Sequence, residues 1–173
     1  MKKPVLYIMV GCSGSGKSTI AEAIHTRIKD IYIVSPDNFR KLLYNDVNYQ
    51  KKNKEVFARA YASMNLLLKT GHNVIFDATN VTAFARINLI SKVQAECEIK
   101  IIYVKVDFET ALNRVKYRTN GQKVPEKVVF NQYNRLKKSE KELFNCPYDV
   151  IVIKNNKENK EKTIDNILFM QYN

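Results

Sequence analysis

The sequence has 173 residues, 45% of them hydrophobic, which suits one domain with a single buried core and leaves no room for a second catalytic module. It contains 29 Lys and Arg against 17 Asp and Glu, so the formal net charge is +12, which favours a polyanionic partner such as nucleic acid. A lysine-rich composition that reflects an AT-rich genome explains this charge equally well. Three widely spaced cysteines fit neither a disulfide framework nor a zinc site.

The hydropathy of the sequence also limits where the protein works. It has no apolar run of about 18 residues that would predict a membrane span, and its start lacks the hydrophobic stretch of a signal peptide. We therefore expect a cytoplasmic protein that does not contact membranes. The sequence does not predict an oligomeric state.

Short apolar runs and longer helix-compatible segments alternate along the chain. The runs predict strands at 5–10, 31–34, 74–76, 99–106 and 150–153, and helices are expected at 17–29, 37–44, 51–69, 82–95, 108–117, 126–144 and 160–171. This alternation predicts an α/β fold, with a parallel sheet covered by helices on both faces, in one domain over residues 1–173. Ligands of such sheets bind beyond the carboxyl ends of the strands, where the motifs described below begin.

The first motif follows the first predicted strand, where residues 11–18 read GCSGSGKS and match the pattern of a phosphate-binding loop. Glycines allow successive N–H groups to turn inward around an anion, and a helix that starts at Lys17 points its positive end at the phosphates. Lys17 adds a full positive charge, and Ser18 is placed to coordinate Mg²⁺. We predict that a nucleotide is bound by Gly11, Ser13, Gly14, Ser15, Gly16, Lys17, Ser18 and Thr19.

The second motif is an acid and a cation that follow the second predicted strand. Asp37 and Arg40 are three residues apart at the start of a helix, so they share one face. A kinase that acts on an alcohol needs a carboxylate to accept the hydroxyl proton and a cation to hold a neighbouring phosphate. The same spacing also suits an acid at a helix N-terminus that pairs with a surface arginine. The sequence alone leaves both interpretations open.

The third motif, DATN at residues 77–80, follows the third predicted strand. It places Asp77 beside the phosphate loop, where a carboxylate can bind a water molecule of Mg²⁺. A cluster of turn-forming residues before the next helix is the structural alternative. We favour the metal-binding role, because acids at strand ends commonly serve the metal in P-loop proteins.

The fourth motif is rich in cations and lies at residues 114–125, which we call the lid. Arg114 and Arg118 are four residues apart on one helical face and run into a Thr-Asn-Gly loop. Such a segment can close over a triphosphate, and the planar, permanently charged guanidinium group suits phosphate. A solvated basic helix face would have the same sequence.

Taken together, GCSGSGKS, SPDNFR, DATN and RVKYR followed by a Val-Pro pair resemble the P-loop 5′-hydroxyl polynucleotide kinases of phage and bacterial end-repair enzymes. The resemblance covers about residues 3 to 150. It implies an adenylate-kinase-like fold of three layers, with strand order 2-3-1-4-5 and a helical lid. It also implies that Asp37 is the general base, that Arg40 contacts the first phosphate of the acceptor, and that Arg114 and Arg118 contact the donor's phosphates.

By this resemblance, we expect a kinase that transfers the γ-phosphate of ATP, or of another NTP, to a 5′-OH end of DNA or RNA with Mg²⁺ as cofactor. Its catalytic residues would be Asp37, Lys17, Arg118 and Arg114. Thr79 and Arg86 are further candidates for binding the acceptor, although Arg86 equally fits a surface position. Two alternatives remain: a kinase for a small-molecule hydroxyl, and a non-metabolic ATP-binding module.

Overall fold

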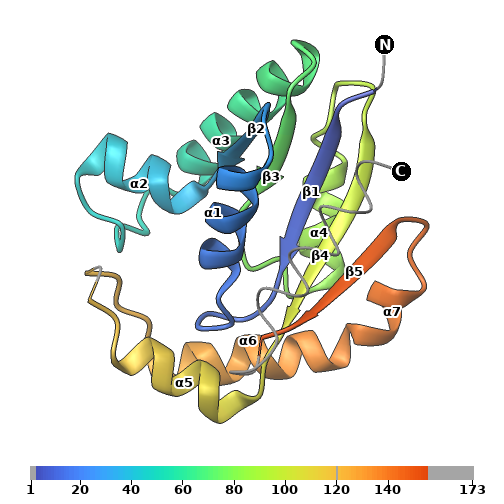
Figure 1. Ribbon diagram of the computed structural model, residues 1–173. Coiled ribbons are helices and arrows are strands. Elements are labelled where there is room, and N and C mark those ends of the chain that lie inside the picture. The colour runs from blue at the N-terminus through green and yellow to red at the C-terminus, as the bar shows by residue number, and fades with distance from the viewer. Residues whose placement is uncertain (1–2, 120, 156–173) are drawn as a thin grey trace.

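The computed structural model describes residues 3–119 and 121–155. In this part of the chain, five strands form one parallel sheet in the order β2-β3-β1-β4-β5, which confirms the predicted α/β fold and strand order (Figure 1). The strands are β1 (Val5–Val10), β2 (Ile31–Val34), β3 (Asn73–Phe76), β4 (Glu98–Lys105) and β5 (Asp149–Lys154). The helices are α1 (Lys17–Arg27), α2 (Pro36–Tyr44), α3 (Asn53–Lys69), α4 (Ala83–Ile90), α5 (Phe108–Lys116), α6 (Glu126–Lys138) and α7 (Glu140–Phe144).

The central strand β1 is buried along its whole length. It pairs with β3 on one side and β4 on the other, so that Tyr7 lies beside Ile75 and Lys100. Because helices cover both faces of a parallel sheet, such a strand is a continuous apolar run in the sequence. The chain leaves β1 at the carboxyl edge of the sheet, which is where ligands bind in this class of fold.

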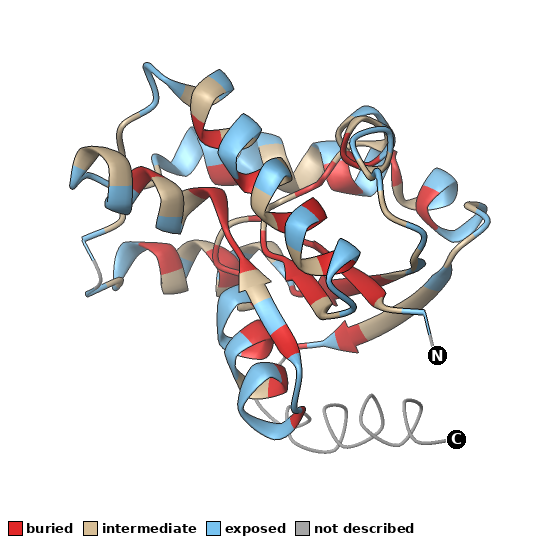
Figure 2. Ribbon diagram, turned by 90° about the horizontal axis from the view of Figure 1, so that it is seen from above, coloured by how far each residue is buried: buried red, intermediate tan, exposed pale blue. Residues whose placement is uncertain are grey.

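Successive side chains of β1 enter two different hydrophobic cores, one on each face of the sheet. Leu6 and Ile8 pack in a core that includes residues of α3, α4, α6 and α7. Tyr7 and Met9 pack in a core that includes residues of α1. Figure 2 shows the buried residues concentrated in the central strands and on the inner sides of the helices. The predicted covering of both faces is therefore confirmed.

The helix predicted at 82–95 is shorter than expected, since α4 ends at Ile90. The turn that follows is held by a buried side chain of α3, Asn65. Its Nδ2 donates to the carbonyl of Lys92 at 2.8 Å, and its Oδ1 accepts from the amide of Gln94 at 2.8 Å. These bonds satisfy backbone groups outside a helix, so the helix does not have to continue.

The helix predicted at 126–144 is divided into α6 and α7 at Ser139. The hydroxyl of Ser139 donates to the carbonyl of Val81 at 2.8 Å, and the carbonyl of Ser139 accepts from Nη2 of Arg86 at 3.2 Å. The junction is thus tied to α4 and to the segment before it, and the chain turns there between the two helices. The helix predicted at 160–171 lies outside the described residues. None of the described helices is both long and apolar enough to cross a bilayer.

Candidate active site

The loop between β1 and α1 has a backbone that requires glycine at two positions. Gly14 and Gly16 have φ values of +83° and +94°, in the left-handed region. A Cβ at Gly14 would lie 2.1 Å from the carbonyl oxygen of Ala111, and one at Gly16 would lie 2.2 Å from Nδ2 of Asn155. Both conformation and space therefore exclude any larger residue there.

The segment after β3 and the helix α6 hold the start of this loop. Gly11 donates its amide to the carbonyl of Thr79, just after β3, at 3.0 Å. Ser13 donates its amide to Oε1 of Gln132, on α6, at 2.8 Å. The predicted loop residues and Thr79 are thus brought together, and Gln132 links the loop to the helix that follows the lid.

The end of the loop is held by Asn155, which directly follows β5 and is only 1% exposed. Its Nδ2 donates to the carbonyl of Ser15 at 2.6 Å, and its amide donates to the carbonyl of Lys105 at 2.9 Å. Arg114 reaches the same place, with Nη1 at 3.4 Å from the carbonyl of Ser15 and Nη2 at 3.0 Å from that of Asn155. The expected lid arginine at 114 therefore contacts the backbone of the phosphate loop.

Lys17 begins α1 and is only 8% exposed. Its Nζ donates to the carbonyl of Cys12 at 2.9 Å. Burial lowers the pKa of Lys17, and the charge of Asp77 opposes this shift. The ammonium is thus held inside the loop at a cost in hydration, which an anionic phosphate next to it would offset.

Ser18 and Asp77 are brought together from α1 and the end of β3. The hydroxyl of Ser18 donates to Oδ2 of Asp77 at 2.6 Å. Burial raises the pKa of Asp77, while Lys17 and the hydrogen bond from Ser18 oppose the rise. A hydroxyl and a carboxylate are the oxygen ligands that suit Mg²⁺, which keeps several of its waters and takes few protein ligands. The predicted metal-binding pair therefore fits this ion.

The predicted pair on α2 is also formed. Nη1 of Arg40 donates to Oδ1 of Asp37 in an ion pair. Arg40 is fixed by further contacts, because its Nε and Nη2 donate to Oδ1 of Asn53 at 3.2 and 2.6 Å, and its guanidinium lies 5.9 Å from the ring centre of Phe57. Nδ2 of Asn53 donates in turn to Oε1 of Gln50 at 2.8 Å. A chain of amides therefore supports the pair.

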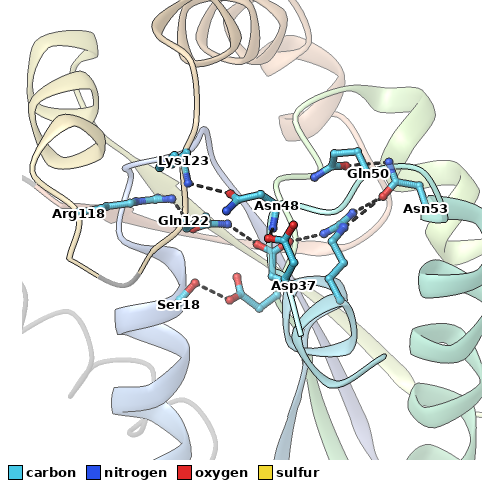
Figure 3. Close-up of polar contacts among 11 residues, drawn as sticks. Ser18, Asp37, Asn48, Gln50, Asn53, Arg118, Gln122 and Lys123 are labelled. Atoms are coloured by element: carbon cyan, nitrogen blue, oxygen red, sulfur yellow. Dashed lines mark hydrogen bonds and ion pairs between the residues drawn. The ribbon is translucent and has the colours of Figure 1, made fainter. Parts of the chain in front are cut away.

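The lid reaches this pair through Gln122. Nη1 of Arg118 donates to Oε1 of Gln122, and Nε2 of Gln122 donates to Oδ2 of Asp37 at 2.7 Å (Figure 3). Burial lowers the pKa of Arg118, and the charges of Asp37 and Asp77 oppose this shift. Arg118 therefore faces the acidic residues of the site.

A cavity of about 580 Å³ lies between α2, α6 and the lid. Asp37 and Arg40 line one side of it, and the apolar side chains of Phe57, Val124 and Val128 line other parts. The cavity also touches the phosphate loop and the metal-binding acid, through Ser13, Asp77, Ala78 and Thr79. An acceptor bound there would meet the donor's phosphates at the carboxyl edge of the sheet.

Arg86 lies neither in the acceptor site nor on the surface, the two positions considered from the sequence. It is only 4% exposed, and its Nη1 donates to the carbonyl of Asn80 at 3.1 Å while its Nη2 donates to that of Ser139 at 3.2 Å. Burial lowers its pKa. Arg86 joins the DATN segment to the junction of α6 and α7, and it does not line the cavity. We correct the expectation accordingly, since its place is structural.

Sequence reasoning missed the amide side chains that organise the site. Gln132 and Asn155 hold the phosphate loop, and Asn48, Asn53 and Gln122 hold the lid and the pair of Asp37 and Arg40. Single Asn and Gln residues have no characteristic spacing, so they resemble the general asparagine richness of the chain. The one signal in the sequence is that Asn155 lies two residues after the end of the last predicted strand, 150–153, at the edge where ligands bind.

The fold and this site define a P-loop protein with a kinase-like α/β architecture. The chain belongs to the AAA domain family, because a family model with that description matches residues 6–143. Membership of this P-loop family implies that the chain binds a nucleoside triphosphate.

Comparisons with individual proteins give three informative relatives. The adenylyl-sulfate kinase of Vibrio parahaemolyticus serotype O3:K6 (strain RIMD 2210633) is 24% identical over 117 residues, which are 65% of this chain and 57% of that protein. A chain in the structure of the Pnkp1/Rnl/Hen1 RNA repair complex is 26% identical with a TM-score of 0.75, over 82% of this chain and 47% of that one. A sugar kinase from Janibacter sp. HTCC2649 is 18% identical with a TM-score of 0.68, over 99% and 95%. The chain spans about half the length of the first two relatives, and the third shows the fold alone.

Proposed function

We propose that this chain is a 5′-hydroxyl polynucleotide kinase of nucleic-acid repair, which transfers the γ-phosphoryl group of ATP or another NTP to the 5′-OH end of DNA or RNA. The observation that carries the proposal is the pair of Asp37 and Arg40 in one cavity that opens onto the phosphate loop. A carboxylate beside a fixed guanidinium matches an alcohol that has a phosphate close by. This combination is present at the 5′ end of a polynucleotide.

The acceptor side of the reaction depends on three side chains. Asp37 orients the 5′-hydroxyl and accepts its proton as the oxygen attacks phosphorus. Arg40, held by Asn53, binds the phosphate that follows the terminal nucleoside. This binding fixes the distance between the 5′-hydroxyl and the carboxylate of Asp37. Positioning of this kind is the main contribution that a protein makes to phosphoryl transfer.

The donor side depends on the loop, α1 and the lid. The loop amides and Lys17 hold the β- and γ-phosphates. Ser18 and Asp77 would hold Mg²⁺, which neutralises phosphate charge when bound. Arg118 neutralises the negative charge on the phosphoryl group in the transition state, while Arg114 supports the loop through Ser15.

The charge of the chain and one of its relatives support a polymeric acceptor. The formal net charge of +12 attracts polyanions, and Lys123 of the lid and Arg40 both line the cavity. The 26% identical relative comes from an RNA repair complex. Contacts to several phosphates would make the affinity for a polynucleotide fall steeply with salt.

A small-molecule kinase is the second candidate, and the size of the cavity favours it. About 580 Å³ is within the range of pockets that bind small ligands. One of the relatives, the adenylyl-sulfate kinase, is named for a small acceptor. Such an enzyme would use the same phosphate loop and the same base, but it would bind no further phosphates of a polymer.

The test is transfer of label from γ-labelled ATP with Mg²⁺ to DNA and RNA oligonucleotides that end in a 5′-OH. Nucleosides and nucleoside 3′-monophosphates serve as small acceptors, and 5′-phosphorylated oligonucleotides serve as the blocked control. We expect labelling of the 5′-OH oligonucleotides, with a KM that rises with salt more steeply than the KM for a nucleoside 3′-monophosphate. Labelling of nucleosides alone would establish the small-molecule kinase, and hydrolysis of ATP without any labelled acceptor would indicate a binding module.

A further inference from the structure

Gln122 connects two residues that the proposed reaction uses from opposite sides of the site. Its Oε1 accepts a hydrogen bond from Arg118, and its Nε2 donates to Oδ2 of Asp37 at 2.7 Å (Figure 3). A carboxamide suits this place because it presents an acceptor and two donors on one rigid, uncharged group. A carboxylate there would repel Asp37, and an ammonium would repel Arg118.

The lid backbone around Gln122 is itself held by Asn48, from the loop between α2 and α3. The amide of Lys123 donates to Oδ1 of Asn48 at 2.8 Å, and Nδ2 of Asn48 donates to the carbonyl of Gly121 at 3.1 Å. Asn48 is fixed in turn, because its own amide donates to Oδ1 of Asp46 at 2.8 Å. The side chain of Asn48 thus binds the lid backbone at the residues before and after Gln122.

The effect on Asp37 is that each of its oxygens has a defined donor. Oδ1 accepts from Nη1 of Arg40, and Oδ2 accepts from Nε2 of Gln122. A carboxylate has about four lone-pair positions, so these bonds leave capacity for a substrate hydroxyl while they fix the plane of the group. Arg40 fixes that plane from α2, and Gln122 fixes it from the lid.

We propose that Gln122 is a positioning residue for phosphoryl transfer and that Asn48 acts through it. When Asn48 holds the lid backbone, the carboxamide of Gln122 sets both the orientation of Asp37 and the position of Arg118. The general base and the cation that stabilises the transferred group are then assembled together. This inference rests on the proposed function, in which Asp37 receives the proton of the acceptor.

The kinetic test compares variants at the two amides with the acceptor that the wild type phosphorylates. Gln122→Met keeps the length of the side chain but removes the hydrogen bonds to Arg118 and Asp37, and we expect kcat to fall about 10- to 100-fold with little change in the KM for ATP. Gln122→Glu should not restore activity, because it places a like charge beside Asp37. Asn113→Ala, at an exposed position of α5 just outside the lid, is the control and should leave kcat unchanged.

The role of Asn48 is tested by a double-mutant cycle. Asn48→Ala should lower kcat, and Asn48→Ala with Gln122→Met should lose no more than Gln122→Met alone, because Asn48 acts through Gln122. Losses that multiply independently, or a Gln122→Met variant with wild-type kcat, would overturn the inference.

Amide hydrogen exchange of Lys123 tests the grip of Asn48 on the lid without any substrate. We expect faster exchange in Asn48→Ala and unchanged exchange in Asn113→Ala. Exchange that is the same in Asn48→Ala and the wild type overturns the inference, even where the kinase assay succeeds. If no acceptor is labelled, the proposed function fails. The kcat values of the same variants are then compared in the hydrolysis of ATP, with water as acceptor.

Discussion

The two partners of the ion pair between Arg40 and Asp37 differ in exposure, since the side chain of Arg40 is 7% exposed and that of Asp37 is 45% exposed. Arg40 is fixed by Asn53 and by the ring of Phe57, whereas the carboxylate that it orients reaches into the cavity. A half-exposed ion pair adds little to stability. The arrangement is better explained by a carboxylate that a substrate must reach and a cation that must stay in place.

The first prediction concerns Asp37 as the base. Asp37→Asn keeps the shape of the side chain but removes the proton acceptor, so we expect phosphoryl transfer at saturating ATP to fall at least about 100-fold. The affinity for ATP with Mg²⁺, measured by calorimetry, should change little because Asp37 lies outside the phosphate loop. Asp30→Asn, which alters an exposed acid just before β2, is the control. Near-normal transfer by Asp37→Asn would remove the base assignment.

The second prediction is that Arg40→Lys is not a conservative change. Three guanidinium nitrogens of Arg40 bond to Asp37 and Asn53, and a single ammonium cannot reproduce that geometry. Loss of a charge-assisted hydrogen bond predicts a kcat/KM for the acceptor that is about 10- to 100-fold lower. Arg59→Lys, in the exposed pair with Glu55, should have no effect in the same assay. Equal kcat/KM for Arg40→Lys and the wild type would contradict the phosphate-binding role.

The fold could be predicted from the sequence because its main signals are local. The continuous apolar run of β1 and the glycines of the following loop have few alternative structures, and alternation of strands with helices then leaves few topologies. The boundaries that failed depend on contacts between distant residues. Asn65 ends α4 by binding the turn after it, and Arg86 divides α6 from α7 by binding Ser139. No local pattern contains that information.

The candidate site divides in the same way. Lys17, Ser18 and Asp77 could be chosen because their spacing from a strand end fixes their position. Asn155 and Gln122 could not be chosen in this way. Asn155 acts through a hydrogen bond to a residue 140 positions away, and Gln122 through one to a residue 85 positions away. An amide that holds a loop leaves no pattern in one sequence, because its role is defined only by its partner.

The third prediction concerns Asn155 as a support for the phosphate loop. Asn155→Ala removes the donor to the buried carbonyl of Ser15, and an unsatisfied buried group costs about 1 to 3 kcal/mol. We expect a KM for ATP that is about tenfold higher, with a smaller change in kcat, because the loop binds donor phosphates. A lower Tm should accompany it.

Two comparisons test whether this effect comes from the hydrogen bond. Asn155→Asp should be at least as damaging as the alanine change, because its carboxylate would face the carbonyl oxygen of Ser15. Asn113→Ala alters an exposed position of α5 and should leave both the KM for ATP and the Tm unchanged. A wild-type KM for ATP in Asn155→Ala would show that the loop keeps its shape without this support.

The last prediction uses the pKa of Glu140, which joins α7 to β4. Oε1 of Glu140 accepts hydrogen bonds from Nζ of Lys105 at 2.7 Å and from the hydroxyl of Tyr103 at 3.0 Å. The bond from Lys105 is the main reason that the pKa of Glu140 lies below its usual value. A carboxyl group with a lowered pKa in the folded state stabilises the fold above its unfolded pKa of about 4.3, and this stability is lost as the pH falls through the folded pKa. Glu140→Gln should therefore be less stable than the wild type at pH 7, by about 1 kcal/mol.

Because the stabilising form is the carboxylate, the difference between Glu140→Gln and the wild type should shrink as the pH falls below about 4. Thermal unfolding measured from pH 7 to pH 3 checks this, and a Tm deficit of about 2 to 4 °C at pH 7 is the expected size. Glu142→Gln, at an exposed position of the same helix, should follow the wild type at every pH. A deficit for Glu140→Gln that stays constant down to pH 3 would show that packing of the side chain, and not its charge, holds α7 against the sheet.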